Sequence, residues 1–237
     1  PTAEVEIIPE PPEPPVIDTI ENRRFDDQAW KNIQNEETDP TLKNLDQYFL
    51  NKPITHRNDY TGLYKDKNFI IFLVEAFDMV AIDEKLTPTL YKLKTEGSYF
   101  DRFYSPQFNC ATAESEFMSM VSIYPVIGTC SLNAYYDITT PQTLFNLFKK
   151  ANYETQSYHN WNDQFYERSI IHPTLGSDLY QDVDQTIGRL VSGWQSDLVM
   201  MQKVVSDLNE KDTTPQMTYV ITSTTHFPYD KDSHLGN

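Results

Sequence analysis

The sequence predicts an α/β fold in which a mostly parallel sheet carries helices on both faces. The apolar run FIIFLV at 69–74 has the length and composition of a central parallel strand that is buried on both faces. Further strand-like segments at 98–105, 155–161 and 217–226 alternate with helix-like segments, as in parallel sheets covered by helices. A chain of 237 residues is long enough to give such a fold a substantial core.

The first 66 residues are predicted to precede the sheet. Residues 1–20 contain six prolines, and because proline fixes φ and lacks an amide donor we expect an extended arm or linker. Residues 21–66 contain two stretches with apolar residues at helical spacing, DQAWKNIQN and TLKNLDQYFLN. We therefore expect a helical lead-in at 21–66 and a sheet-containing domain at 67–237.

Several helix boundaries can be proposed from local signals. A threonine followed by proline opens a helix at 87–88, and Gly97 closes it. The same pair recurs at 140–141 ahead of LFNLFKKANY. The segment ATAESEFMSMVSI reads as a helix that begins near Thr112, and an amphipathic helix is predicted at 196–211.

The charge balance excludes one broad class of partner. Acidic residues outnumber basic ones 35 to 19, which gives a formal net charge of −16. Such a surface repels nucleic-acid phosphates, and no basic patch offsets it, so we expect no nucleic-acid binding.

No apolar run approaches the roughly 20 residues of a membrane span. The chain does not begin with Met, which fits a processed ectodomain whose anchor lies upstream.

Polar residues follow the predicted strands at the edge where parallel sheets bind ligands. Glu75 ends the first strand, the region 159–163 ends a second, and His226 ends a third. Thr112 lies at a helix start, where the helix dipole favours an anion. We expect these features to meet at one edge of the sheet and to form the functional site.

Each candidate also has an ordinary structural interpretation. Glu75 is either a metal ligand or a carboxylate that emerges into solvent. Thr112 is a helix cap, a nucleophile, or both. His226 either contacts phosphate oxygens and protonates a leaving group or is tied to backbone in the turn before Pro228. Arg168 either grips a phosphate with its two-pronged guanidinium or forms a surface salt bridge.

The two cysteines leave a further choice open. Cys110 is a competing nucleophile, although free cysteine is more often a small buried hydrophobe. Cys110 and Cys130 would form one bridge in an oxidising compartment, and the sequence does not decide whether they do.

Four ordered segments resemble a known family. In chain order they are NDYTGLYKDKNFIIFLVEAFD, LTPTLYKLKTEGSYFDRFYSP, TAESEFMSMVSIYP and THFPY. They resemble the extracellular domain of lipoteichoic acid synthases, members of the alkaline phosphatase/sulfatase-like superfamily. The resemblance covers roughly residues 45–230.

The resemblance implies a membrane-anchored Gram-positive enzyme whose catalytic domain lies on the extracellular face of the membrane. Such an enzyme transfers glycerol phosphate from phosphatidylglycerol to a growing polymer. The implied cofactor is a divalent metal, most simply Mn²⁺, with Mg²⁺ or Zn²⁺ as the other options. The implied partners are a glycerophospholipid headgroup, a glycerol phosphate polymer, and the membrane through a segment that this chain lacks.

Individual roles follow from the positions that match the family's motifs. The resemblance places the metal-binding glutamate at Glu75 and the nucleophilic, metal-binding threonine at Thr112, within TAESEF. It places the phosphate-contacting histidine at His226. The headgroup-binding arginine falls on Arg168, with Tyr166 where a tryptophan is usual.

Two departures from the family pattern limit these expectations. The family often has His-Gly-Asp where this chain has HNW, so His159 keeps its place and Trp161 stands at the aspartate position. The family completes its metal site with a downstream Asp-His pair, and here Asp232 and His234 are separated by serine and come too early. We therefore expect this fragment alone to bind metal poorly and to be inactive.

Three functions remain to be separated at this point. The leading one is phosphoglycerol transfer through Thr112. The alternatives are phosphoethanolamine transfer or phosphodiester hydrolysis with the same nucleophile, and a catalytically incomplete domain that binds glycerol phosphate polymer. Sulfatase activity is rejected, because the family's sulfatases need a cysteine or serine within C/S-x-P-x-R and Cys110 lacks that context.

Overall fold

The computed structural model describes residues 27–53, 58–138, 140–162, 166–183, 196–210 and 214–227. The chain divides into two units, residues 1–65 and 66–237. The predicted arm at 1–20 lies outside the described residues.

The described residues of the first unit contain two helices. They are α1 (Asp27–Glu36) and α2 (Pro40–Leu50). The Trp30 Nε1–H donates to Asp46 Oδ1 over 2.8 Å and joins the two helices. Asp39 caps α2, because its carboxylate accepts from the amides of Thr41 and Leu42.

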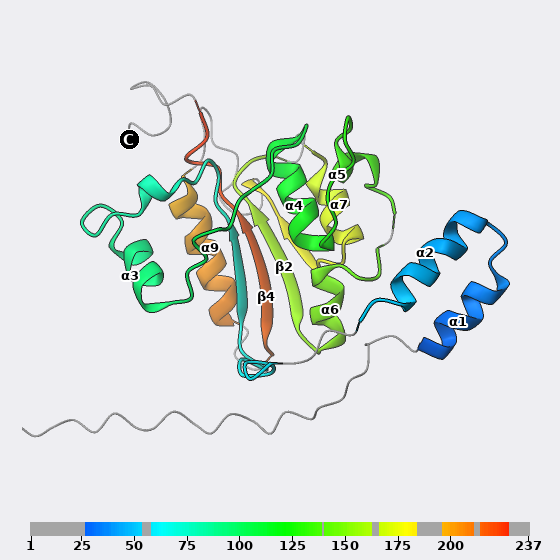
Figure 1. The fold of residues 1–237 in the computed structure, drawn as a ribbon. Coiled ribbons are helices and arrows are strands. Elements are labelled where there is room, and N and C mark those ends of the chain that lie inside the picture. Colours follow the sequence, from blue (N-terminus) through cyan, green and yellow to red (C-terminus); the bar gives the residue numbers. More distant parts are fainter. Residues whose placement is uncertain are drawn as a thin grey trace, which may run out of the picture. The chain divides into compact units, whose positions relative to one another are not determined.

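The second unit contains a parallel sheet, which confirms the predicted fold class (Figure 1). Its strands are β1 (Phe69–Leu73), β2 (Glu154–His159), β3 (Leu179–Gln181) and β4 (Gln216–Ile221). The spatial order is β1-β4-β2-β3, and every neighbouring pair is parallel. The carboxyl ends of all four strands therefore point to the same edge.

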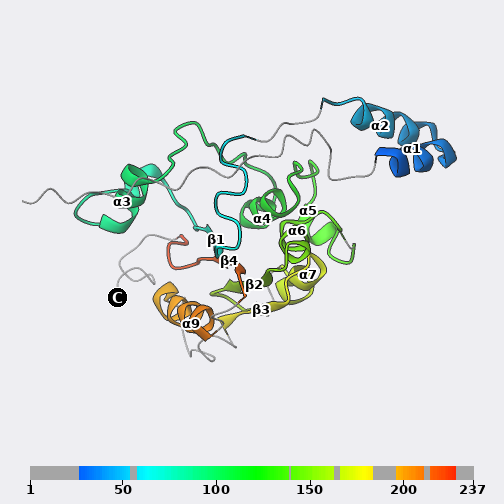
Figure 2. The same cartoon turned by 90° about the horizontal axis from the view of Figure 1, so that it is seen from below.

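Helices cover both faces of this sheet (Figure 2). One face carries α4 (Ala111–Val121), α5 (Ser131–Ala134), α6 (Leu144–Lys150) and α7 (Arg168–Thr174), and the other carries α9 (Asp197–Glu210). The short helices η1 (Met79–Ala81) and α3 (Pro88–Glu96) follow β1 in the chain.

Alternate side chains of β4 enter two separate cores. Met217, Tyr219 and Ile221 pack on the α4–α7 face, whereas Val220 packs on the α9 face with Met200, Val204 and Tyr158. All of these side chains are fully buried. Because both faces of β4 are covered, its sequence MTYVI reads as a near-continuous apolar run.

Two strand predictions differ from the structure. β1 lies at the edge of the described sheet instead of its centre, and the side chains of Phe69, Ile70 and Phe72 stay about 40–50% exposed. The segment 98–105 forms no strand, and Phe103 is 84% exposed. A strand needs a hydrogen-bonded neighbour, and the described sheet offers none to this segment.

Helix boundaries agree with the sequence except where a different residue provides the cap. α3 and α9 match their predictions closely. α6 begins later than the threonine-proline pair at 140–141 suggested, because the side chain of Thr143 accepts from the Asn146 amide over 3.1 Å and caps it. None of the described helices has the length and apolar character to cross a membrane.

Candidate active site

Glu75 lies just beyond the carboxyl end of β1, where the loop after β4 holds its backbone. The Glu75 amide donates to Thr222 Oγ1 over 2.9 Å, and the hydroxyl of Thr225 donates to the Glu75 carbonyl. The side chain of Glu75 is half-buried. The carboxylate is therefore presented from a fixed backbone at the edge where ligands bind in parallel sheets.

The hydroxyl of Thr112 donates to this carboxylate, with 3.0 Å between Thr112 Oγ1 and Glu75 Oε2. Thr112 lies in the first turn of α4, whose N-cap residue is Cys110. The expectation that Thr112 caps the helix is therefore wrong, since the helix begins at Ala111 and the hydroxyl faces Glu75 instead. Two residues that are 37 positions apart in the sequence meet as the motifs suggested.

The donor atoms of this pair fit part of a site for a hard divalent cation. A carboxylate and a hydroxyl are both oxygen ligands, which Mg²⁺ and Mn²⁺ prefer. Within the described residues Glu75 forms no ion pair, so no protein cation neutralises it there. Two ligands are too few for a stable site, and among the described residues no group of three His, Cys, Asp or Glu side chains that could hold a metal includes Glu75.

His226 belongs to the same loop as Thr225. Its amide donates to the Ser223 carbonyl over 3.0 Å, and its Nδ1 lies 2.7 Å from the Phe227 carbonyl. These contacts match the backbone-bound arrangement that the sequence left as an alternative. The loop nevertheless places His226 one residue beyond the contact with Glu75, at the same edge of the sheet.

Arg168 is buried in an ion pair, and the alternative of a surface salt bridge is wrong. Its side chain is 2% exposed, and its Nε lies 3.0 Å from both carboxylate oxygens of Glu116. Its Nη2 also bonds to Glu116, and His172 Nε2 lies 3.0 Å from Glu116 Oε2. Within the described residues Nε and Nη2 both bond to Glu116, so this carboxylate fixes the orientation of the guanidinium.

The buried charges in this cluster shift one another's pKa. Burial alone would raise the pKa of Glu116, but Arg168 and His172 outweigh it and lower the pKa to about 2. Burial alone would lower the pKa of Arg168, but the Glu116 carboxylate outweighs it and raises the pKa. The pair is thus fully charged at neutral pH.

His159 is held in its neutral form at the end of β2. Burial, reinforced by the positive charge of Arg168, lowers its pKa to about 3. Its Nδ1 lies 3.2 Å from the Ile221 carbonyl, which only accepts, so the proton sits on Nδ1. Trp161 is half-buried, and its carbonyl accepts from the Val183 amide over 3.4 Å. Asp163 lies outside the described residues.

Tyr166 connects the buried cluster with the Thr112 side of the site. The Arg168 guanidinium lies over its ring, 5.1 Å from the centroid. Burial raises the pKa of Tyr166, with Arg168 opposing and the carboxylates of Glu116 and Glu75 adding to the rise. The phenol is thus within electrostatic range of both carboxylates.

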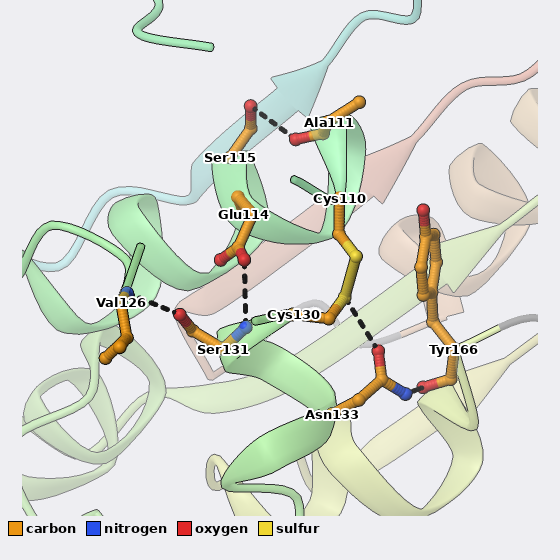
Figure 3. Close-up of a disulfide and its surroundings, with 9 residues drawn as sticks. All are labelled: Cys110, Ala111, Glu114, Ser115, Val126, Cys130, Ser131, Asn133 and Tyr166. Atoms are coloured by element: carbon orange, nitrogen blue, oxygen red, sulfur yellow. Dashed lines mark hydrogen bonds between the residues drawn. A yellow bond between two sulfur atoms is a disulfide. The ribbon is translucent and has the colours of Figure 1, made fainter. Parts of the chain in front are cut away.

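The structure also settles the question of the cysteines. Cys110 and Cys130 form a disulfide with 5.4 Å between their Cα atoms (Figure 3). Cys110 therefore has no free thiol with which to compete with Thr112 as a nucleophile.

Three residues at the site were missed by the sequence analysis. Glu116 and His172 complete the Arg168 cluster, and Asp197 accepts from the amides of Ser223 and Thr224. Glu116 was visible in TAESEF, one helical turn after Thr112, and that spacing could have found it. No local signal distinguishes Asp197 from an ordinary acidic residue at a helix start.

The comparisons with known proteins agree with this geometry. The sulfatase family profile matches residues 67–236, so the chain belongs to the sulfatase family. Within it, the chain is similar to proteins named lipoteichoic acid synthases. A lipoteichoic acid synthase-like protein, YvgJ of Bacillus subtilis, is 26% identical over 212 residues, which are 85% of this chain and 33% of YvgJ. The Staphylococcus aureus lipoteichoic acid synthase is 26% identical over 185 residues, 73% of this chain and 28% of that protein.

A solved structure supports the same assignment. The crystal structure of the lipoteichoic acid synthase LtaP from Listeria monocytogenes superposes with a TM-score of 0.66 at 26% identity, covering 74% of this chain and 48% of that one. The chain thus spans about a third of the length of the curated relatives it matches. Cys110, the cysteine that was compared with the sulfatase motif, has no free thiol because it is bound in the disulfide.

Proposed function

We propose that residues 67–237 form the N-terminal part of the catalytic domain of a metal-dependent phosphoglycerol transferase with Thr112 as the nucleophile. The observation that carries this proposal is the 3.0 Å contact between Thr112 Oγ1 and Glu75 Oε2 at the carboxyl edge of the sheet. The relatives named lipoteichoic acid synthases support the substrate class.

The reaction would proceed in two displacement steps at phosphorus. Thr112 Oγ1 attacks the phosphorus of phosphatidylglycerol and loses its proton, while the bond from phosphorus to the diacylglycerol oxygen breaks and diacylglycerol leaves as an alcohol. The glycerol phosphate is then held as a diester on Thr112. A hydroxyl at the end of a glycerol phosphate polymer attacks that phosphorus, and Thr112 regains its proton.

Glu75 and Thr112 would hold a divalent cation, for which we propose Mn²⁺, together with further ligands from the complete protein. When bound, the cation supplies positive charge that lowers the pKa of a hydroxyl and offsets the charge of the phosphate. Glu75 contributes by accepting the Thr112 hydrogen bond, which orients the oxygen that attacks.

The remaining candidates would bind the substrate. Arg168 would offer its guanidinium to the phosphate or headgroup, beside the ring of Tyr166. His159 would accept a hydrogen bond from a glycerol hydroxyl through Nε2, since its proton sits on Nδ1. His226 would contact phosphate oxygens from the loop after β4, and Trp161 would border the headgroup.

Substitution of the nucleophile tests this proposal in the complete protein that carries this chain. Thr112→Ala should lower phosphatidylglycerol consumption by roughly 1,000-fold or more, because no other described hydroxyl donates to the Glu75 carboxylate. Thr112→Ser is the matched control and should keep measurable activity. Mass spectrometry of the trapped enzyme should find glycerol phosphate on the Thr112 peptide. Wild-type turnover by Thr112→Ala would refute the proposal.

The second candidate function is the transfer of a different lipid headgroup. Trp161 stands where the family often has aspartate, and the neighbouring Asn160 is engaged with Asp197 over 3.2 Å. Neither residue supplies the negative charge that an aspartate would. Turnover of phosphatidylglycerol and phosphatidylethanolamine vesicles by the complete protein separates the two, and a preference for the second would move the assignment to phosphoethanolamine transfer.

We also propose that the domain works at the extracellular face of a Gram-positive membrane, anchored by a segment outside this chain. The disulfide supports an oxidising compartment, and the named relatives come from Gram-positive bacteria. A membrane-impermeant reductant applied to intact cells should open the disulfide, whereas a cytoplasmic domain would stay protected from it.

A further inference from the structure

The backbone immediately before Thr112 is strained and has no side-chain cap. The N-cap residue Cys110 makes no capping hydrogen bond, and Ala111 has φ of +32°. A non-glycine residue at positive φ is strained and persists only where the surrounding structure holds it. The position of Thr112 therefore depends on what fixes residues 110 and 111.

Two links join the first turn of α4 to the start of α5 (Figure 3). The disulfide connects Cys110 with Cys130, and Glu114 Oε1 accepts from the Ser131 amide over 2.8 Å. Glu114 is only 1% exposed, so this hydrogen bond is shielded from water. One link lies two residues before Thr112 and the other two residues after it, and together they fix the nucleophile's turn from both sides.

The same short helix also contacts the substrate side of the site. Asn133 of α5 donates from Nδ2 to the Tyr166 carbonyl over 3.4 Å, and its Oδ1 lies 3.2 Å from Cys130 Sγ. Tyr166 itself has φ of +68° and directly precedes the turn into Arg168. Helix α5 and its N-cap Cys130 thus contact both the first turn of α4 and the backbone of Tyr166, as Figure 3 shows.

We propose that the Cys110–Cys130 disulfide, assisted by the Glu114–Ser131 hydrogen bond, positions Thr112. It keeps the Thr112 hydroxyl within hydrogen-bond distance of the Glu75 carboxylate. Turnover then requires the oxidised pair, which makes the enzyme sensitive to reduction. This inference rests on the proposed function of Thr112. Reduction by a dithiol breaks the S–S bond, leaves thiols on Cys110 and Cys130, and oxidises the dithiol to its cyclic disulfide.

The expected effect falls on kcat more than on KM. Loss of the disulfide lets Ala111 relax, and a displacement of about 1 Å at a reacting atom costs up to roughly 100-fold in rate. Arg168 is anchored by Glu116, and the hydrogen bonds that hold this pair do not involve Cys110 or Cys130, so we expect substrate binding to change less. We expect kcat to fall about 10- to 100-fold and KM to change by less than about threefold.

The experiment uses the complete protein with phosphatidylglycerol vesicles, assayed at 25 °C before and after treatment with dithiothreitol. Mass analysis of the thiols gives the fraction of molecules reduced, and circular dichroism at the same temperature gives the fraction folded. The variant C110S/C130S should match the reduced wild type and should show no response to dithiothreitol. Reoxidation should restore the wild-type kcat but not that of the variant.

Two outcomes would overturn the inference. A fully reduced, folded enzyme with the wild-type kcat would show that the disulfide only stabilises the fold, and so would a loss that follows the unfolded fraction alone. Thr112→Ala, assayed in parallel, separates this failure from that of the proposed function. If Thr112→Ala stays active, the nucleophile assignment fails first; if it is inactive while reduction has no effect, only the positioning role fails.

Glu114 provides a second test with a matched pair of variants. Glu114→Gln keeps an oxygen that accepts from the Ser131 amide, whereas Glu114→Ala removes it. The alanine variant should lose more kcat than the glutamine variant at equal folded fraction, and its loss should deepen after reduction because both links are then broken. Equal kcat in the two variants, before and after reduction, would contradict a role for this link.

Discussion

Two carboxylates beside helix α4 have opposite surroundings. Glu116, in the second turn, is buried and bonded to Arg168 and His172, so the protein neutralises it with its own cation. Glu75, which meets Thr112 of the first turn, is half-buried and forms no ion pair within the described residues. A carboxylate without a protein cation at a ligand-binding edge is the one suited to a metal ion, whereas the paired carboxylate is suited to orienting Arg168.

This difference predicts that neutralising Glu75 abolishes function and spares the fold. Glu75→Gln in the complete protein should lower turnover by roughly 1,000-fold and weaken Mn²⁺ binding, because the amide is a poorer ligand than the carboxylate. The melting temperature should stay close to wild type, since no buried charge loses its partner. Isothermal titration with Mn²⁺ and thermal unfolding measure the two effects, and unchanged Mn²⁺ affinity would contradict the assignment.

Neutralising Glu116 should do the reverse and damage the fold first. Glu116→Gln leaves the buried guanidinium of Arg168 without its counter-charge, which typically costs about 3–5 kcal/mol of unfolding free energy. Urea unfolding of the two glutamine variants side by side measures the contrast. A Glu116→Gln protein as stable as Glu75→Gln would show that the buried pair contributes no more than the half-buried carboxylate.

Lowering the pH should reduce the free energy of unfolding more gradually, and by less, than the Glu116→Gln substitution. The pKa of His159 is lowered from 6.5 to about 3, so the unfolded chain binds the proton more readily, and stability falls as pH drops from 6.5 towards 3. The pKa of Glu116 is lowered from 4.5 to about 2, so its contribution is complete above pH 4.5 and is lost as pH falls towards 2.

Each group adds up to about 1.4 kcal/mol per pH unit within its window. His159→Asn places an amide donor near the position of Nδ1 and cannot titrate, so it should remove the part of the acid sensitivity that begins near pH 6.5. Denaturant titrations from pH 7 to pH 3 test this. Identical slopes for the variant and the wild type above pH 4.5 would assign that sensitivity to other groups.

Much of the fold follows from local sequence signals, but the limits of its elements depend on tertiary contacts. The apolar runs at 69–74 and 217–221 identify two strands, because covered parallel strands are apolar on both faces. β4 ends at Ile221 instead of continuing to residue 226, because Asp197 accepts from the amides of Ser223 and Thr224. That carboxylate comes from a distant helix, so no local pattern could show where the strand stops.

The candidate site could also be predicted only in part, because some of its contacts depend on the tertiary structure. The ordered motifs predicted that Glu75 and Thr112 belong to one site, and the structure places them in contact. The partner of Arg168 was not predicted, because an exposed ion pair and a buried one have the same residue types in sequence. Whether Cys110 and Cys130 pair was also left open, since the distance between them depends on how α5 packs against α4.

Asp197 has a further consequence for how this site could be altered. It begins α9 on one face of the sheet and holds the loop whose Thr225 bonds to Glu75, while Thr112 reaches the same glutamate from α4 on the other face. The Glu75–Thr112 pair is thus held by residues from the helical layers on both faces of the sheet, which meet at the strand ends. Transplanting TAESEF into another sheet would move the hydroxyl without the loop that fixes the carboxylate opposite it.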